Sequence, residues 1–148
     1  GSIDFLRNET KINVSFDFSK VEIEGKPVKY WIAKEGEEWK NDWEEAIPEF
    51  SEKFVRTLNA VMIDKSRDLD FGNFQEANYQ LTVQFLTIDD DNDVKALLIF
   101  SQNNSQNALA EISINGKAGK FGSMANLIGD AMIDAGEKFG KFLIRKIE

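Results

Sequence analysis

The sequence predicts a single α+β domain over residues 1–148, with an antiparallel or mixed sheet of about four strands and two helices packed on one face. Alternating apolar and polar residues, the period of a half-buried strand, occur in residues 11–32 and 79–114. Two longer segments, 37–63 and 123–146, repeat apolar residues every three or four positions, as helices do. The length of 148 residues suits one domain that buries its own core.

The first predicted strand covers residues 11–23, where four apolar residues alternate with polar ones. These four residues are Ile12, Val14, Phe16 and Phe18. Residues 24–27 contain glycine and proline and predict a turn. Residues 28–32 then predict a short second strand that pairs back on the first as a hairpin.

The first predicted helix lies between Glu37 and Ile63. Pro48 lies inside this pattern and has no backbone N–H to donate, so we expect the main helix to begin beside Pro48 and to end at Ile63. Residues 64–77 are polar and irregular, and they predict a long connection without regular structure.

Three strand patterns follow, over residues 79–85, 94–100 and 109–114, with polar turns between them. Because the connections are short, we expect an antiparallel meander. The continuous apolar run from Val94 to Phe100 predicts a strand that is covered on both faces.

The last helix is predicted from Ser123 to Lys146. Its three interior glycines would each cost up to about 1 kcal/mol relative to alanine, so they predict the close approach of another backbone. They are Gly129, Gly136 and Gly140, and we expect the sheet to lie against them.

Composition excludes several classes of function. The formal net charge is −8, so nucleic acid is not an expected partner. The chain has no cysteine and no histidine, which removes Ser-His-Asp and Cys-His catalysis and the usual zinc ligands. No pair of carboxylates stands out as a general acid and base. We therefore expect no enzymatic activity, no catalytic residue and no cofactor.

Two polar segments could each either bind a ligand or form an ordinary solvated turn. Residues 89–93 (DDDND) are rich in oxygen ligands, but Val94 and Phe100 stand where a calcium loop beginning at Asp89 needs glycine and glutamate. A solvated hairpin turn without metal is therefore favoured. Residues 115–123 (NGKAGKFGS) could hold an anion at a helix N-terminus, but a flexible turn capped by Ser123 is favoured.

Aromatic residues concentrate in residues 30–43, which makes this segment a candidate surface for a partner or a carbohydrate. Trp39 and Trp43 are in register with the apolar face of the first helix, which favours core packing. Trp31 alternates out of phase with its neighbours. Trp31 and Tyr30 are therefore the predicted partner or ligand contacts.

No apolar run approaches the ~20 residues of a membrane-spanning helix, and no signal segment is present. Gly1, together with Ser2, is typical of a cloning remnant. We therefore expect that the natural amino terminus was trimmed, which would also have removed any signal peptide or lipid anchor.

Segments of residues 37–147 resemble a known domain. The stretch "ANYQLTVQFLTID", then "ALAEISINGKAGKFG", then a closing helix with Ala135, Gly136 and Phe139, is similar to the anticodon-binding-like α/β domain of bacterial envelope proteins, which includes the TolB amino-terminal domain and related lipoprotein domains of unknown function. That family has Ala-Asp-Tyr where this chain has Ala-Asn-Tyr, and no shared catalytic residues carry over. The resemblance implies an extracytoplasmic domain, periplasmic or lipid-anchored, that contacts other envelope proteins.

These observations favour a non-enzymatic cell-envelope domain that acts in protein interaction or assembly. The alternative is a domain that binds a small ligand or carbohydrate through Trp31 and its neighbours. Partners could include a second copy of the chain, because an unprotected sheet edge is a route to dimers. The candidate edges are the first strand and the strand over residues 94–100.

Overall fold

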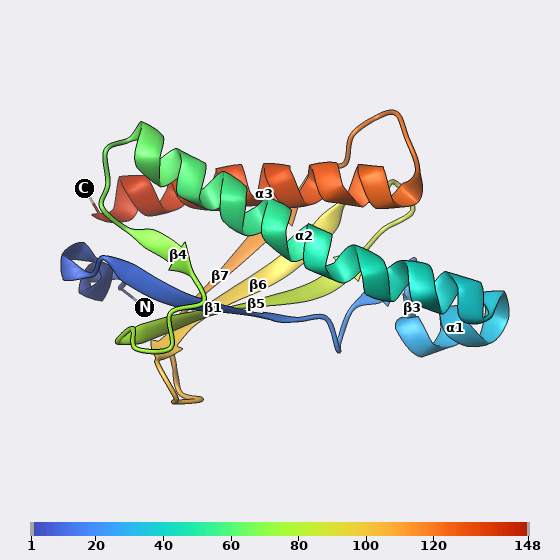
Figure 1. Cartoon of the computed structure of the whole chain (residues 1–148), viewed down its shortest axis with the longest axis horizontal. Coiled ribbons are helices and arrows are strands. Elements are labelled where there is room, and N and C mark those ends of the chain that lie inside the picture. Colours follow the sequence, from blue (N-terminus) through green and yellow to red (C-terminus); the bar gives the residue numbers. More distant parts are fainter. Residues whose placement is uncertain (1, 148) are drawn as a thin grey trace.

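Two long helices, α2 and α3, lie side by side on one face of a sheet (Figure 1). This computed structural model describes residues 2–147, so the interpretation of Gly1 as a cloning remnant falls outside the described residues. The predicted α+β class is confirmed. Within residues 2–147, however, the sheet has seven strands rather than about four, and there are three α-helices rather than two. In chain order the elements are η1 (Asp4–Asn8), β1 (Lys11–Asp17), β2 (Glu22–Ile23), β3 (Lys26–Pro27), α1 (Val28–Glu35), α2 (Glu37–Asp64), β4 (Asp70–Gly72), β5 (Tyr79–Ile88), β6 (Val94–Gln102), β7 (Ala108–Gly116) and α3 (Met124–Ile147).

Strand β5 is at the centre of the sheet. It pairs antiparallel with β6 on one side and parallel with β1 and β2 on the other. Strand β7 pairs antiparallel with β6, β4 parallel with β1, and β3 antiparallel with β2. The sheet is therefore mixed. The predicted edge at residues 94–100 is wrong, because β6 lies between β5 and β7. The other predicted edge, the first strand β1, pairs with β4 only over Lys11–Asn13.

The predicted hairpin of residues 11–32 is mostly wrong. Only β2 and β3 form a small hairpin, closed by Glu24 and Gly25, which both have positive φ angles of 51° and 79°. Residues 28–35 form helix α1 rather than a strand. The half-buried residues of α1 are Val28, Trp31 and Ile32, a helical spacing that the alternation of Val28, Tyr30 and Ile32 conceals.

Helix α2 is continuous from Glu37 to Asp64, so the expected start beside Pro48 is wrong. Pro48 is an exposed residue inside the helix. The apolar positions before and after Pro48 share one buried face, and packing of that face outweighs the missing hydrogen bond. The buried positions of α2 are Trp43, Phe50, Phe54, Leu58 and Met62.

The predicted irregular connection at residues 64–77 contains a strand, β4. Phe71 in β4 is 2% exposed, and its backbone N–H and carbonyl both bond the side-chain amide of Asn59 in α2, at 2.9 Å each. The Asn59 amide thus pairs with backbone groups of β4 and ties α2 to this edge of the sheet.

The meander of β5, β6 and β7 is confirmed. The expected burial of β6 on both faces is wrong. Residues facing the helices are buried, but Lys95 on the opposite face is exposed, and Leu97 and Ile99 are half-buried. That opposite face also carries Thr82 and Gln84 of β5, which bond Ser15 and Asp17 of β1.

Helix α3 extends from Met124 to Ile147, close to the predicted bounds. Its glycines do allow a close approach, but α2 approaches them rather than the sheet. A β-carbon on Gly129 would meet the Lys53 side chain, one on Gly136 the Phe54 carbonyl oxygen, and one on Gly140 the Val61 side chain. The sheet touches α3 at a different glycine, Gly116 at the end of β7, which lies against the Ala131 carbonyl.

Candidate functional site

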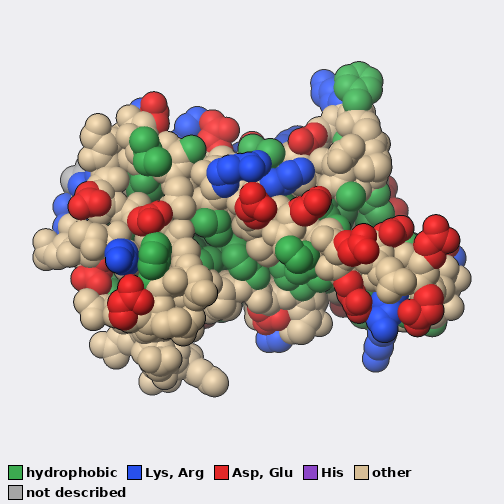
Figure 2. All heavy atoms as spheres, viewed as in Figure 1, with side chains coloured by type: hydrophobic (Ala, Val, Ile, Leu, Met, Phe, Trp, Pro, Cys, Tyr) green, Lys and Arg blue, Asp and Glu red, His purple; other side chains and the backbone are tan. Residues whose placement is uncertain are grey.

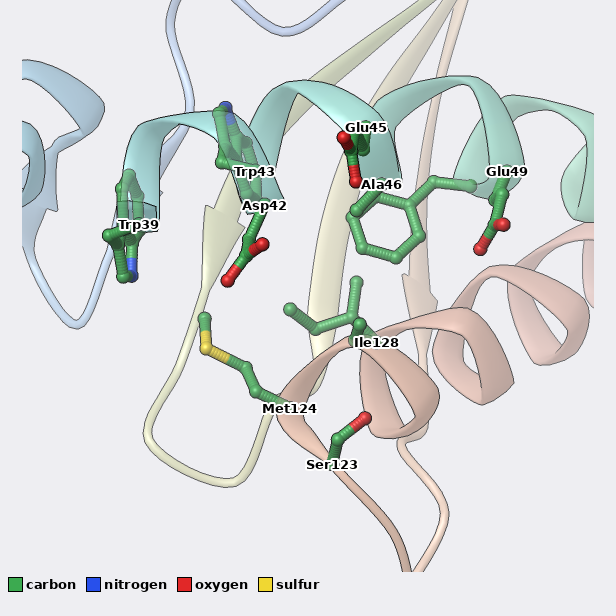
Figure 3. A pocket seen from close by; sticks show the side chains of 11 residues that line it. Trp39, Asp42, Trp43, Glu45, Ala46, Glu49, Ser123, Met124 and Ile128 are labelled. Carbon is green, nitrogen blue, oxygen red and sulfur yellow. The ribbon is translucent and has the colours of Figure 1, made fainter. Parts of the chain in front are cut away.

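A groove of about 470 Å³ lies between the first half of α2 and the start of α3 (Figure 3). Gly129, near the start of α3, lies opposite Lys53, near the middle of α2. The first half of α2 therefore extends past the beginning of α3, and the groove lies where the two helices are offset. We call it the α2–α3 groove. Its lining residues are Trp39, Asp42, Trp43, Glu45, Ala46, Glu49, Phe50, Ser123, Met124, Ala125 and Ile128.

The floor of the α2–α3 groove is aromatic and aliphatic. Trp39 and Trp43, one helical turn apart on α2, stack with ring centroids 5.9 Å apart and an angle of 9° between their planes. Trp43 contacts Phe50 edge to face at 6.1 Å. Met124 and Ile128 of α3 point toward α2 across the groove (Figure 3). Trp43 is 8% exposed, whereas Trp39 is half-buried and Met124 is 39% exposed, so the floor is partly open to a ligand.

The rim of the α2–α3 groove is acidic. Asp42, Glu45 and Glu49 follow one another at three and four residues, which places them along one side of α2. All three are exposed, and none forms a salt bridge with another residue in the described part of the chain. Figure 2 shows acidic side chains gathered over the end of the molecule that carries α1 and the start of α2. The groove thus combines an apolar floor with a rim of unpaired negative charge.

Residues 117–122 form a loop beside the α2–α3 groove, which we call the projecting loop. It leads from β7 into α3 and stands away from the body of the molecule (Figure 1). Phe121 in this loop is 89% exposed, the highest exposure among the large hydrophobic residues described. Ser123, which follows the loop, accepts a hydrogen bond from the Asn126 N–H at 3.2 Å, so the predicted cap by Ser123 is confirmed.

The structure places Trp31 and Tyr30 beside the α2–α3 groove and not in it. The Trp31 indole N–H donates to the Ile23 carbonyl at 2.9 Å, and the Trp31 ring stacks on Trp39 at 6.4 Å. Trp31 is half-buried rather than exposed, and its role as a partner or ligand contact stays a prediction. Tyr30 is 41% exposed and remains available to a partner. The expected core packing holds for Trp43 and in part for Trp39, which is half-buried and packs against the core. Both tryptophans also line the groove.

Residues 89–93 form the turn between β5 and β6. Asp89 Oδ1 accepts hydrogen bonds from the backbone N–H groups of Asp91 and Asp93, at 2.9 and 3.0 Å. Carboxylate oxygens of Asp89, Asp90 and Asp91 lie within 4.8 Å of one another, and all three residues are exposed. The hydrogen bonds inside this segment are those of an ordinary aspartate turn.

Two backbone N–H groups at the start of the loop after β7 already have carboxylate acceptors. The Lys117 N–H donates to Asp134 Oδ2 and the Ala118 N–H to Asp93 Oδ1, at 2.7 Å each. The Lys117 ammonium group lies 3.5 Å from Asp93 Oδ2. Carboxylates of the chain thus already bind these two N–H groups and the Lys117 ammonium group, which favours the turn interpretation.

Among residues 2–147, two carboxylates have a clearly shifted pKa, and in both the shift is downward. Hydrogen bonds from the Ser19 hydroxyl and backbone N–H, and from the Gln84 side chain, hold the pKa of Asp17 below its ordinary value. Hydrogen bonds with Ser2 and Arg7 lower the pKa of Asp4. A general acid needs a raised pKa, so neither group fits that role.

No family model matches the sequence, and no curated protein matches it. Two solved structures are similar to the chain. One is PelC from Paraburkholderia phytofirmans, solved as a dodecamer, with 10% identity, a TM-score of 0.45 and 87% of each chain covered. The other is a DUF330 protein from Xanthomonas campestris, with 9% identity, a TM-score of 0.44, and coverage of 92% of this chain and 81% of that one. Likenesses at this level carry no functional argument.

Within residues 2–147, no helix is both long enough and apolar enough to cross a membrane.

Proposed function

We propose that this chain is a non-enzymatic protein-interaction module, and that the α2–α3 groove is its docking site. The occupant is a segment of a partner protein that carries an apolar or aromatic side chain next to lysine or arginine. One observation carries the proposal: an apolar floor with a half-buried tryptophan and three unpaired carboxylates line the same groove.

The two parts of the α2–α3 groove would contribute differently to binding. An aromatic side chain that leaves water for the floor gains about 1.5–3 kcal/mol. The carboxylates of Asp42, Glu45 and Glu49 are exposed, so pairing them with basic groups adds less affinity. These pairs instead select a partner with positive charge and speed its association. The same rim repels phosphate, which argues for a protein partner and against nucleic acid.

The proposed location is the cell envelope, with other envelope proteins as partners. This part of the proposal is supported by the sequence resemblance described above and not by the groove. Fractionation of the native cells, with detection of the natural protein by antibody, tests it. Recovery in the periplasmic or membrane fraction is expected, and recovery in the cytoplasm alone would contradict the envelope location.

The docking function is tested with a synthetic peptide that alternates lysine with phenylalanine, titrated into the chain by calorimetry. We expect binding that weakens as salt rises, because the rim charges are exposed and screened. The variant Asp42→Lys/Glu45→Lys should lose affinity about tenfold or more, as two attractions become repulsions. Asp64→Lys, a single charge reversal at the far end of α2, is the control for each of the single reversals Asp42→Lys and Glu45→Lys.

Failure to bind that peptide, or equal binding by the rim variant and the wild type, would refute the docking site. A second peptide with glutamate in place of lysine should not bind, since the rim would repel it.

Carbohydrate binding is a second candidate function, favoured by the half-buried Trp39 beside Asp42. Sugar rings stack on aromatic faces, and carboxylates accept hydrogen bonds from hydroxyl groups. Titration with neutral and amino-bearing oligosaccharides, followed by tryptophan fluorescence, tests this candidate. A saturable change that Trp39→Ala abolishes would support it, and a flat titration would count against it.

A further inference from the structure

The projecting loop has the chemistry that the α2–α3 groove accepts. Its residues 117–122 read KAGKFG, which places Phe121 directly after Lys120. We infer that the α2–α3 groove of one copy binds the projecting loop of a second copy, so that the chain forms a homodimer. This inference rests on the proposed docking function and names a partner for it.

The base of the projecting loop is held in place. The backbone N–H groups of Lys117 and Ala118 donate to Asp134 and Asp93, and Gly119 lies against the Asp130 carboxylate. Gly122 has a φ angle of +119°, a conformation that other residues rarely adopt. The loop therefore presents its tip from a fixed base, which lowers the entropy lost when the tip binds.

The side chains at the tip of the projecting loop are not bound by another part of their own chain. Phe121 is 89% exposed, so its ring does not enter the neighbouring α2–α3 groove. Lys120 is also exposed, and among residues 2–147 it has no carboxylate within salt-bridge distance. Figure 2 shows a hydrophobic side chain beside a basic one at the tip of the corresponding projection. An apolar ring and a free cation thus complement an apolar floor and three free carboxylates.

The position of the loop allows both contacts of a dimer to form together. Residue 122 of the loop is followed by Ser123 and Met124, which line the α2–α3 groove. Loop and groove are therefore adjacent parts of one surface. A two-fold axis through that surface places each copy's loop at the other's groove, which makes a closed, isologous dimer rather than a chain of copies.

Sedimentation velocity over a range of concentrations tests the inference. We expect a weak dimer of the wild type, in the micromolar to millimolar range, because each groove buries little more than one aromatic side chain. Phe121→Ala should raise the dissociation constant about tenfold or more. Ile63→Ala removes another apolar side chain, 77% exposed, at the far end of α2, and should leave the dimer unchanged. A wild type that stays monomeric up to about 1 mM overturns the inference.

Charge exchange tests the pairing of loop and groove. Lys120→Glu alone and Asp42→Lys/Glu45→Lys alone should each weaken the dimer about tenfold, whereas the chain with all three changes should recover most of the affinity. Further weakening in the triple variant overturns the inference. A monomeric wild type that still binds the lysine–phenylalanine peptide refutes self-association and leaves the docking function standing.

Discussion

Gly136 of α3 lies so close to Phe54 of α2 that a β-carbon on the glycine would be 2.7 Å from the Phe54 carbonyl oxygen. This contact lets the two helices pack backbone to backbone below the α2–α3 groove. Gly140 repeats it one turn later against Val61, where a β-carbon would come within 2.8 Å of the Val61 β-carbon. The glycines therefore set the separation of the helices that form the groove.

Gly136→Ala should destabilise the protein by about 1–3 kcal/mol, because the Phe54 backbone cannot move aside without shifting α2. Gly129→Ala is the matched control. A β-carbon there meets mainly the end of the flexible Lys53 side chain, so the gain in helix propensity, up to about 1 kcal/mol, should offset the crowding. Chemical denaturation measures both free energies of unfolding. Equal losses in the two variants would show that Gly136 is not a special contact.

Pro48→Ala should stabilise the protein by up to about 3 kcal/mol, because alanine restores the N–H donor for the Glu44 carbonyl in the middle of α2. Pro48 is exposed, so the change removes little packing. Asn41→Ala, at another exposed position of α2, should change stability by less than about 0.7 kcal/mol. Thermal unfolding followed by circular dichroism distinguishes the two, and a destabilised Pro48→Ala would mean that the fold requires the proline at this point of α2.

Asp17→Asn should lower stability at pH 7 by about 1 kcal/mol or less, since Asp17 accepts hydrogen bonds from Ser19 and Gln84 at a partly exposed site. The pKa of Asp17 is lowered in the folded state, so this stability is present above the unfolded-state pKa. It is lost as the pH falls below about 4. The free energies of unfolding of wild type and variant should therefore converge in acid. A difference that persists unchanged at pH 2 would contradict this.

The long, strongly periodic elements were predictable from the sequence, because their apolar spacing is set by the buried face. The meander of β5 to β7 and helix α3 are examples. Short elements were not predictable in this way. The eight residues of α1 fit both the spacing of a helix and the alternation of a strand. The three residues of β4 form a strand only because they pair with β1 and bond the Asn59 side chain.

The candidate site was only partly predictable. The concentration of aromatic residues near α2 pointed to the region of the α2–α3 groove, but the choice of Trp31 depended on a strand that does not form. Trp39 lies in the groove because α2 extends beyond the start of α3. The relative position of these two helices, which are far apart in the sequence, cannot be predicted from the local spacing of apolar residues. The spacing of Asp42, Glu45 and Glu49 places them on the same side of one helix, and this spacing was the sequence feature that could have predicted the acidic rim.

The most direct test of the docking site follows the indole N–H signals of the three tryptophans by nuclear magnetic resonance while the lysine–phenylalanine peptide is added. Single tryptophan-to-phenylalanine variants assign the signals. The groove predicts that the Trp39 and Trp43 signals move most, and that the Trp31 signal, whose N–H is bound to the Ile23 carbonyl, moves least. Unchanged signals, or a response confined to Trp31, would contradict the α2–α3 groove as the docking site.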